Sequence, residues 1–136
     1  MAAKLETGDY ETLAQFRYLL ARFLAFSEDA AREAGLSPRQ HQALLAIKGY
    51  PGGEAVTIGD LAERLVIRHH SAVGLADRLE RSGYLKRSVD AADKRRIMLT
   101  LTKKGERALA ALSAAHRDEL RRLTPMLKPL LARMER

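Results

Sequence analysis

The stretch from Thr57 to Gly105 carries the clearest structural signals and reads TIGDLAERLVIRHHSAVGLADRLERSGYLKRSVDAADKRRIMLTLTKKG. Its first half predicts two short helices joined by a tight turn. Thr57 is a capping residue that begins the first helix, and the second runs from about residue 69 to 82. Gly83 follows at the position where helices commonly end in a left-handed residue. This arrangement is a helix-turn-helix.

The second half of the stretch changes from a helical period to a period of two. Apolar and polar residues alternate over 85–89 and again over 97–101, which predicts two strands. The polar interval 90–95 is short enough to be a hairpin tip, and Val56 is a candidate for a further short strand. The sequence therefore predicts a winged helix-turn-helix, in which the hairpin is the wing.

The segment before this stretch predicts two more helices. Apolar residues recur at mostly helical spacing over 9–34, which indicates one long amphipathic helix. Ser37, Pro38 and Gln40 then form a start signal, because serine caps the free N–H groups, proline fits the first turn and glutamine completes a capping box. The helix that they begin stops before the turn-rich segment 49–53.

The segment after this stretch predicts a last long helix. Thr102 caps it, and leucines recur along it at helical spacing. Pro125 and Pro129 are expected to bend or break it and to leave a short tail helix that reaches Arg136.

Composition limits the classes of function. The 136 residues include 24 Lys and Arg against 17 Asp and Glu, a net charge of +7, which favours anionic partners. The chain has no cysteine, which excludes disulfides, thiolate metal ligands and thiol-based catalysis or oxidant sensing. No apolar run is long enough to span a bilayer, so we expect a soluble cytoplasmic protein with no membrane partner.

The helix expected at 69–82 has one apolar face and one polar face. Four apolar residues lie within an arc of about 100° and must face the core: Ala72, Leu75, Ala76 and Leu79. The opposite arc carries Asp77 and Arg81 besides donor-rich residues at the start of the helix. Such a helix fits the major groove of DNA with its N-terminal end first, where a guanidinium suits guanine or phosphate. The candidate DNA-binding residues are Arg68, His69, His70, Ser71, Val73, Gly74 and Arg78.

Gly74 is unusual among these candidates. A glycine inside a helix costs about 1 kcal/mol relative to alanine. One explanation is a close approach of DNA at this point, and the alternative is tight helix packing or simple tolerance.

The wing is strongly basic. It contains five cations: Lys86, Arg87, Lys94, Arg95 and Arg96. A solvated basic hairpin is the alternative, but these cations lie beside a candidate recognition helix, which favours DNA. We expect Arg95 to enter a narrow minor groove and Asp93 to hold its guanidinium in place. Lys86, Arg87 and Lys94 are expected to contact phosphates.

These residues resemble a known family. The segment LADRLERSGYLKR, the wing tip Asp93–Arg96 and the exit LTLTKKG are similar to those of MarR-type transcriptional regulators, and the flanking helices agree in order and length. The resemblance implies an obligate homodimer whose first and last helices interlock and which reads a pseudo-palindromic operator in double-stranded DNA. It also implies repression, with release from DNA when a small anionic or phenolic effector binds.

The expected architecture follows from the patterns and the resemblance together. We expect a single protomer over 1–136, mainly α with a small β-hairpin wing. Residues 37–101 form the winged-helix region, and residues 9–34 and 103–136 form dimerisation helices. Both long helices carry apolar stripes, and burying one leucine or phenylalanine contributes roughly 1.5–3 kcal/mol. The alternative to a dimer is that these stripes pack within their own protomer.

The histidines do not predict a metal site. His41 and His116 lie on helices that could meet, with Glu28 or Glu33 as carboxylate partners, as in zinc-responsive members of the same family. Further ligands are missing, so surface or hydrogen-bonded histidines are the preferred interpretation. His69 and His70 point about 100° apart and suit DNA contact, which would make binding pH-sensitive near pH 6.5.

The remaining predictions concern small molecules and rival functions. An effector cleft could be lined by Phe16, Arg17, Tyr18, Phe23, Phe26 and His41, although such a stripe is more often core. No cofactor is expected, and no phosphate loop, nucleophile elbow or metalloprotease motif indicates an enzyme. The main rival is a winged-helix protein that binds nucleic acid non-specifically through its charge.

Overall fold

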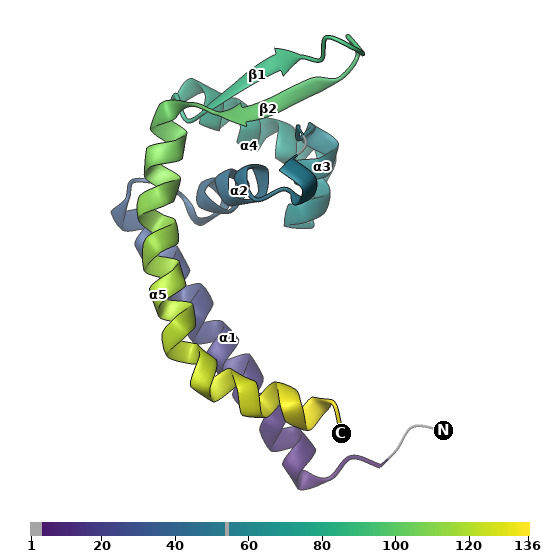
Figure 1. Ribbon diagram of the computed structural model, residues 1–136, viewed down its shortest axis with the longest axis vertical. Coiled ribbons are helices and arrows are strands. Elements are labelled where there is room, and N and C mark those ends of the chain that lie inside the picture. The colour runs from purple at the N-terminus through teal and green to yellow at the C-terminus, as the bar shows by residue number, and fades with distance from the viewer. Residues whose placement is uncertain (1–3, 54) are drawn as a thin grey trace.

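A computed structural model describes residues 4–53 and 55–136. It is mainly helical with one small antiparallel hairpin, as predicted (Figure 1). The elements in chain order are α1 (Thr7–Glu33), α2 (Pro38–Lys48), a 3-10 turn (Pro51–Gly53), α3 (Ile58–Leu65), α4 (His69–Arg81), β1 (Leu85–Val89), β2 (Ile97–Leu101) and α5 (Lys103–Met134).

The predicted capping residues begin their helices. The Ser37 hydroxyl accepts a hydrogen bond from the Gln40 amide at 3.1 Å, and the Gln40 side chain accepts one from the Ser37 amide at 2.9 Å. Thr57 and Asp60 form the same reciprocal pair at the start of α3. The side chain of Thr102 accepts from the Gly105 amide at 3.1 Å and begins α5.

The wing forms from the two predicted strands, which pair antiparallel. Leu85 pairs with Leu101 and Val89 with Ile97, while Val56 adds an isolated bridge to Leu99. Gly83 has a φ of +83° and ends α4 as expected. A Cβ atom at Gly105 would collide with the Tyr84 carbonyl oxygen, so only glycine lets α5 pack against the root of the wing.

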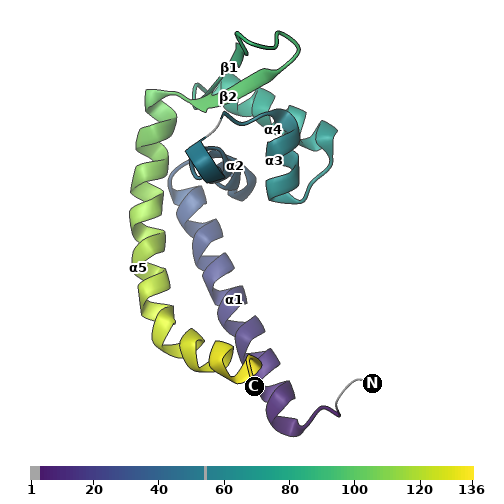
Figure 2. The same cartoon turned by 45° about the vertical axis from the view of Figure 1, so that its right-hand side comes forward.

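The molecule has two parts, which we call the body and the stalk. The body, residues 30–112, contains α2, α3, α4, the wing and the adjoining ends of the two long helices around one apolar core. The stalk consists of residues 7–29 and 113–134 and extends away from the body (Figures 1 and 2). Its own buried apolar cluster contains only Leu19, Leu123 and Leu130, flanked by Phe23 and Leu127.

Of the two outcomes expected at the prolines, α5 bends and does not break, so the expected separate tail helix is wrong. α5 continues through Pro125 and Pro129 to Met134, and it bends in its last third (Figures 1 and 2). Both prolines lie on exposed positions, so water can satisfy the carbonyls that lose an N–H partner. Packing of Leu123 and Leu130 against α1 holds the helix together across the prolines.

None of the helices in the described residues is long and apolar enough to cross a membrane.

Candidate nucleic-acid interface

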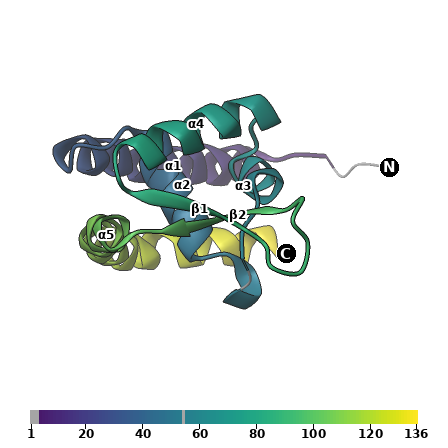
Figure 3. The same cartoon turned by 90° about the horizontal axis from the view of Figure 1, so that it is seen from above.

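The core-facing side of α4 is as predicted. Its four apolar residues are at most 3% exposed: Ala72, Leu75, Ala76 and Leu79. His70, Ser71 and Arg78 are exposed on the other side, while Val73 and Gly74 are half-buried. α4 and the wing lie side by side at the end of the molecule remote from the termini (Figures 1 and 3). One surface of the body therefore presents both elements.

The start of α4 is positively polarised. Arg68 is its N-terminal capping residue, and within the described part of the chain it makes no side-chain capping hydrogen bond. The first N–H groups of the helix are therefore left for another acceptor. Arg68, His69, His70 and Ser71 are all exposed around them. This end of the helix suits an anionic partner.

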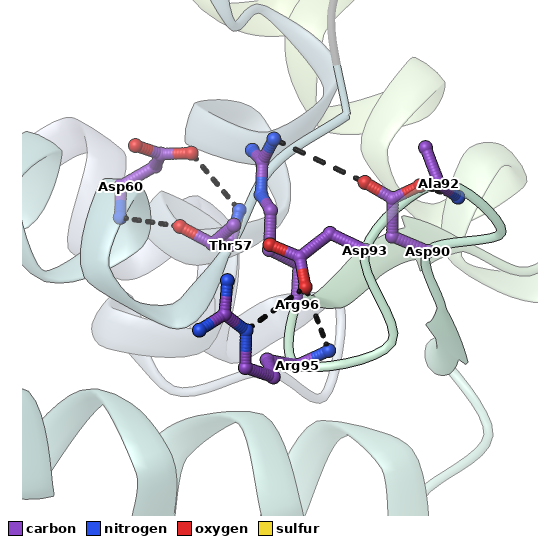
Figure 4. A network of polar contacts seen from close by, with 7 residues as sticks. All are labelled: Thr57, Asp60, Asp90, Ala92, Asp93, Arg95 and Arg96. Carbon is purple, nitrogen blue, oxygen red and sulfur yellow. Dashed lines mark hydrogen bonds and ion pairs between the residues drawn. The ribbon is translucent and has the colours of Figure 1, made fainter.

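The wing tip holds Arg95 in place while leaving it exposed. The Asp93 carboxylate accepts hydrogen bonds from the Arg95 amide at 3.1 Å and from Arg95 Nε at 3.2 Å (Figure 4). The Arg95 side chain is 92% exposed. Asp90 organises the same loop, since it accepts from the Ala92 amide at 2.9 Å and lies 3.9 Å from the Arg96 guanidinium. Asp93 therefore restrains Arg95 within the wing tip.

Arg87 has a structural contact that the sequence reasoning missed. Its guanidinium donates a hydrogen bond to the Asp77 carboxylate, and its Nε lies 3.9 Å from Glu80. The side chain is only 26% exposed. This ion pair ties the first wing strand to the recognition helix. Asp77, an acidic residue on the polar arc of α4, was the signal in the sequence that pointed to such a pair. An acid beside DNA phosphate is unfavourable unless a cation neutralises it.

Gly74 has room for a larger residue. A Cβ atom there would meet only the Arg78 guanidinium, at an ordinary contact distance of 3.7 Å, among the described residues. Tight packing within the chain therefore does not explain this glycine.

A cavity of about 620 Å³ lies where the stalk meets the body, between α1, α2 and α5. Its walls are largely apolar, with Phe23, Leu24, Leu45 and Leu120 among them. Four positively charged or titratable side chains also line it: His41, His116, Arg117 and Arg121. Of the residues expected at a cleft, Phe23 and His41 line this cavity. Phe26 does not line it and packs against the His116 ring instead. Phe16, Arg17 and Tyr18 do not line it either, because they lie nearer the start of α1 on exposed positions.

His41 and His116 are packed together inside the protein, and of the two expected alternatives, surface or hydrogen-bonded histidines, the hydrogen-bonded one holds for His116. Their ring centroids are 4.7 Å apart, and the side chains are 3% and 9% exposed. The Phe26 ring packs edge-on against the His116 ring, with 5.4 Å between the two ring centroids. Burial lowers the pKa of His41 below its usual value of 6.5, and the charge of His116 lowers it further. In the described residues, no three His, Asp or Glu side chains are close enough to hold a metal ion.

Sequence and structure comparisons place this geometry among known proteins. Residues 34–96 match the model of the MarR family, which covers the helix-turn-helix and most of the wing. The transcriptional activatory protein BadR of Rhodopseudomonas palustris is 31% identical over 97 residues, which is 71% of this chain and 55% of that protein. The chain belongs to the MarR family.

Solved structures share the fold of this MarR-family chain. The DNA complex of MepR from Staphylococcus aureus superimposes with a TM-score of 0.72 at 20% identity, covering 97% of this chain and 93% of that one. CouR from Rhodococcus jostii, bound to p-coumaroyl-CoA, gives a TM-score of 0.72 at 21% identity over 88% and 82% of the two chains. The chain spans about half the length of the curated relatives that it matches. These relatives are transcriptional regulators and not enzymes, as expected.

Proposed function

We propose that this MarR-family protein is a homodimeric, sequence-specific DNA-binding regulator that represses transcription and is released from DNA by a small effector. One observation carries the DNA-binding role: α4, with its exposed candidate contacts, lies beside the wing, whose tip presents the exposed, Asp93-held Arg95 (Figures 3 and 4). A helix and a basic hairpin presented together fit a major groove and the adjoining minor groove.

The individual residues divide by the part of DNA that they contact. Arg68 and His70 read base edges from the start of α4, together with His69, Ser71, Val73 and Arg78. Arg95 enters the minor groove. Lys86 and Lys94 contact phosphates, as does Arg87 through the N–H groups that Asp77 leaves available.

The dimer is supported by the apolar surface of the stalk. On α1 a continuous stripe is exposed in the single chain: Leu13, Phe16, Leu20 and Leu24. On α5 Leu120, Met126, Leu131 and Met134 are exposed as well. A second copy would cover both stripes and would place two α4 helices on one duplex, at half-sites about one helical turn apart. Two copies over adjacent turns would obstruct access to a promoter.

The effector role is supported by the cavity between the stalk and the body. Its apolar walls and its four cationic or titratable side chains suit a small organic anion with an apolar body. CouR, which shares this fold, is bound to the aromatic thioester p-coumaroyl-CoA. A molecule held where the stalk meets the body would change the angle between these two parts. The distance between the two α4 helices of the dimer would change with it.

Selection of bound DNA from a random library tests the proposed function. We expect an enriched two-fold repeat, whereas enrichment of no sequence would favour a non-specific nucleic-acid binder. Arg68→Ala and His70→Ala should each change the base preference, by about 1–3 kcal/mol for a direct contact. Arg95→Ala should weaken binding most at A·T-rich flanks, and an equal loss on every sequence would refute minor-groove insertion.

Salt dependence and a matched control complete this test. A dimer that makes about 6–10 phosphate contacts loses roughly 10³–10⁵ in affinity between 50 and 200 mM salt. Arg22→Ala, which removes a cation from α1 in the stalk, should leave both the consensus and the salt slope unchanged.

A further inference from the structure

His116 is held in one hydrogen-bonding state by two neighbours. Its Nδ1 lies 2.7 Å from the Leu112 carbonyl oxygen, and its Nε2 lies 2.8 Å from Ser27 Oγ. Because a carbonyl can only accept, Nδ1 carries a proton and donates it to Leu112. In the neutral ring Nε2 is therefore an acceptor, and the Ser27 hydroxyl donates to it. Both ring nitrogens are satisfied in this state.

The same three groups can also satisfy a protonated ring. If Nε2 gains a proton, it donates to Ser27 Oγ, and the serine O–H turns away and needs an acceptor elsewhere. Ser27 lines the cavity together with His116. An acceptor in the cavity would therefore complete a chain that runs from Leu112 through His116 and Ser27 to the bound molecule.

The charges around His116 determine which acceptor fits. From α2 it faces His41, whose ring centroid is 4.7 Å away, and α1 contributes Phe23, Phe26 and Ser27, none of which titrates. From α5 itself, Arg117 and Arg121 line the cavity. No Asp or Glu is among the described residues that line it. A protonated His116 thus lacks a counter-charge until an anion enters.

We propose that an organic carboxylate binds in this cavity together with one proton: the carboxylate accepts the Ser27 O–H, and His116 Nε2 takes a proton from solvent and donates it to Ser27 Oγ. This inference rests on the effector role proposed above. His41 remains neutral beside the imidazolium, because burial and the neighbouring charge both lower its pKa. Effector release of DNA would then be stronger at lower pH.

Isothermal titration calorimetry with p-coumarate tests the proposal, with methyl p-coumarate as the uncharged probe. By analogy with glutamate and tyrosine, the carboxyl and phenol of p-coumarate titrate near pH 4 and 10, so its charge is constant between pH 6.5 and 8. Titrations in buffers of different ionisation enthalpy report the protons taken up per ligand. We expect uptake that approaches one proton, and a dissociation constant that rises with pH by up to about tenfold per unit. The ester should show neither effect.

Three variants assign the proton. His116→Gln keeps a side chain that can hydrogen bond but cannot titrate, and it should abolish the uptake and flatten the pH profile. Ser27→Ala should do the same by removing the relay. Ser82→Ala, which removes an exposed hydroxyl at the end of α4, should behave as the wild type. Uptake that persists in His116→Gln would overturn the proposal, as would p-coumarate binding without uptake in the wild type.

The outcome separates this inference from the functions on which it rests. If neither the acid nor the ester binds at millimolar concentration, both the relay and the effector cavity are wrong. If p-coumarate binds without a proton, only the relay fails. DNA recognition is judged independently by the library selection.

Discussion

The body and the stalk contain the same kinds of apolar residue but bury them to different extents. In the body, leucines such as Leu44, Leu61 and Leu79 are fully buried around one core. In the stalk, only Leu19, Leu123 and Leu130 are buried, while Leu20 and Leu24 on the same helix are 41% and 47% exposed. The body completes its own core within one chain. The stalk leaves its apolar stripes exposed for a second chain to cover.

Charging the stalk stripe should give the largest effect. In the double variant Leu20→Glu/Leu24→Glu, each chain would bury two carboxylates in the interface between copies. We therefore expect a monomer. A monomer lacks the α4 helix of the second copy, so its affinity for a two-fold DNA site should be lower by about 10²–10⁴-fold. Sedimentation and DNA titration measure the two results. Ala25→Glu, on an exposed position about 140° round α1 from Leu20, is the matched control. A dimer that survives the double substitution would contradict the interface.

Truncation within the body should be the next largest effect. Leu79 is fully buried between α4 and the core, so Leu79→Ala should lower the free energy of unfolding by about 2–5 kcal/mol. Urea denaturation measures it. Val89→Ala, at an exposed wing position, should remain within about 0.5 kcal/mol of the wild type. A loss below about 1 kcal/mol for Leu79→Ala would show that the body is not closely packed.

Gly74→Ala should change stability and DNA binding in opposite directions. The added methyl has room beside Arg78, so the helix should be stabilised by up to about 1 kcal/mol. If DNA approaches the backbone at this point, the affinity for the selected site should fall. Gly59→Ala in α3 also has room, and it should leave DNA affinity unchanged. Unchanged DNA affinity in Gly74→Ala would remove the close-approach explanation.

Acidification should give the smallest effect, at the junction of the two parts. Because the pKa of His41 in the folded chain lies below its unfolded value of 6.5, the unfolded chain binds more protons as the pH falls below 6.5. Stability present above pH 6.5 is therefore lost as the pH falls toward the lowered pKa. Between pH 7.5 and 5.5, His41→Gln should lose less Tm than the wild type, by a few degrees at most. Equal losses in both proteins would show that His41 does not contribute.

The sequence predicted most of the fold because its signals are local. Each capping pair, Ser37 with Gln40 and Thr57 with Asp60, joins two residues that are three positions apart. The alternation over 85–89 and 97–101 specifies the two strands of the wing. The path of α5 through its prolines was missed, because side-chain packing against α1 outweighs two lost hydrogen bonds on an exposed face.

The candidate site was predicted only as far as neighbouring residues determine it. Asp93 and Arg95 are two positions apart, and their hydrogen bond follows from that spacing. The Asp77–Arg87 pair and the contact between His41 and His116 depend on how separate elements pack, which no local pattern specifies. The cavity between the stalk and the body also depends on how separate elements pack.

Native mass spectrometry of the protein on a duplex that carries the selected site counts the chains that bind together. Each chain has a mass of 15.2 kDa. We expect a complex with two chains per duplex, formed without a populated one-chain species at saturating protein. A complex that saturates with one chain per duplex, while keeping full affinity and sequence preference, would contradict the proposed dimer.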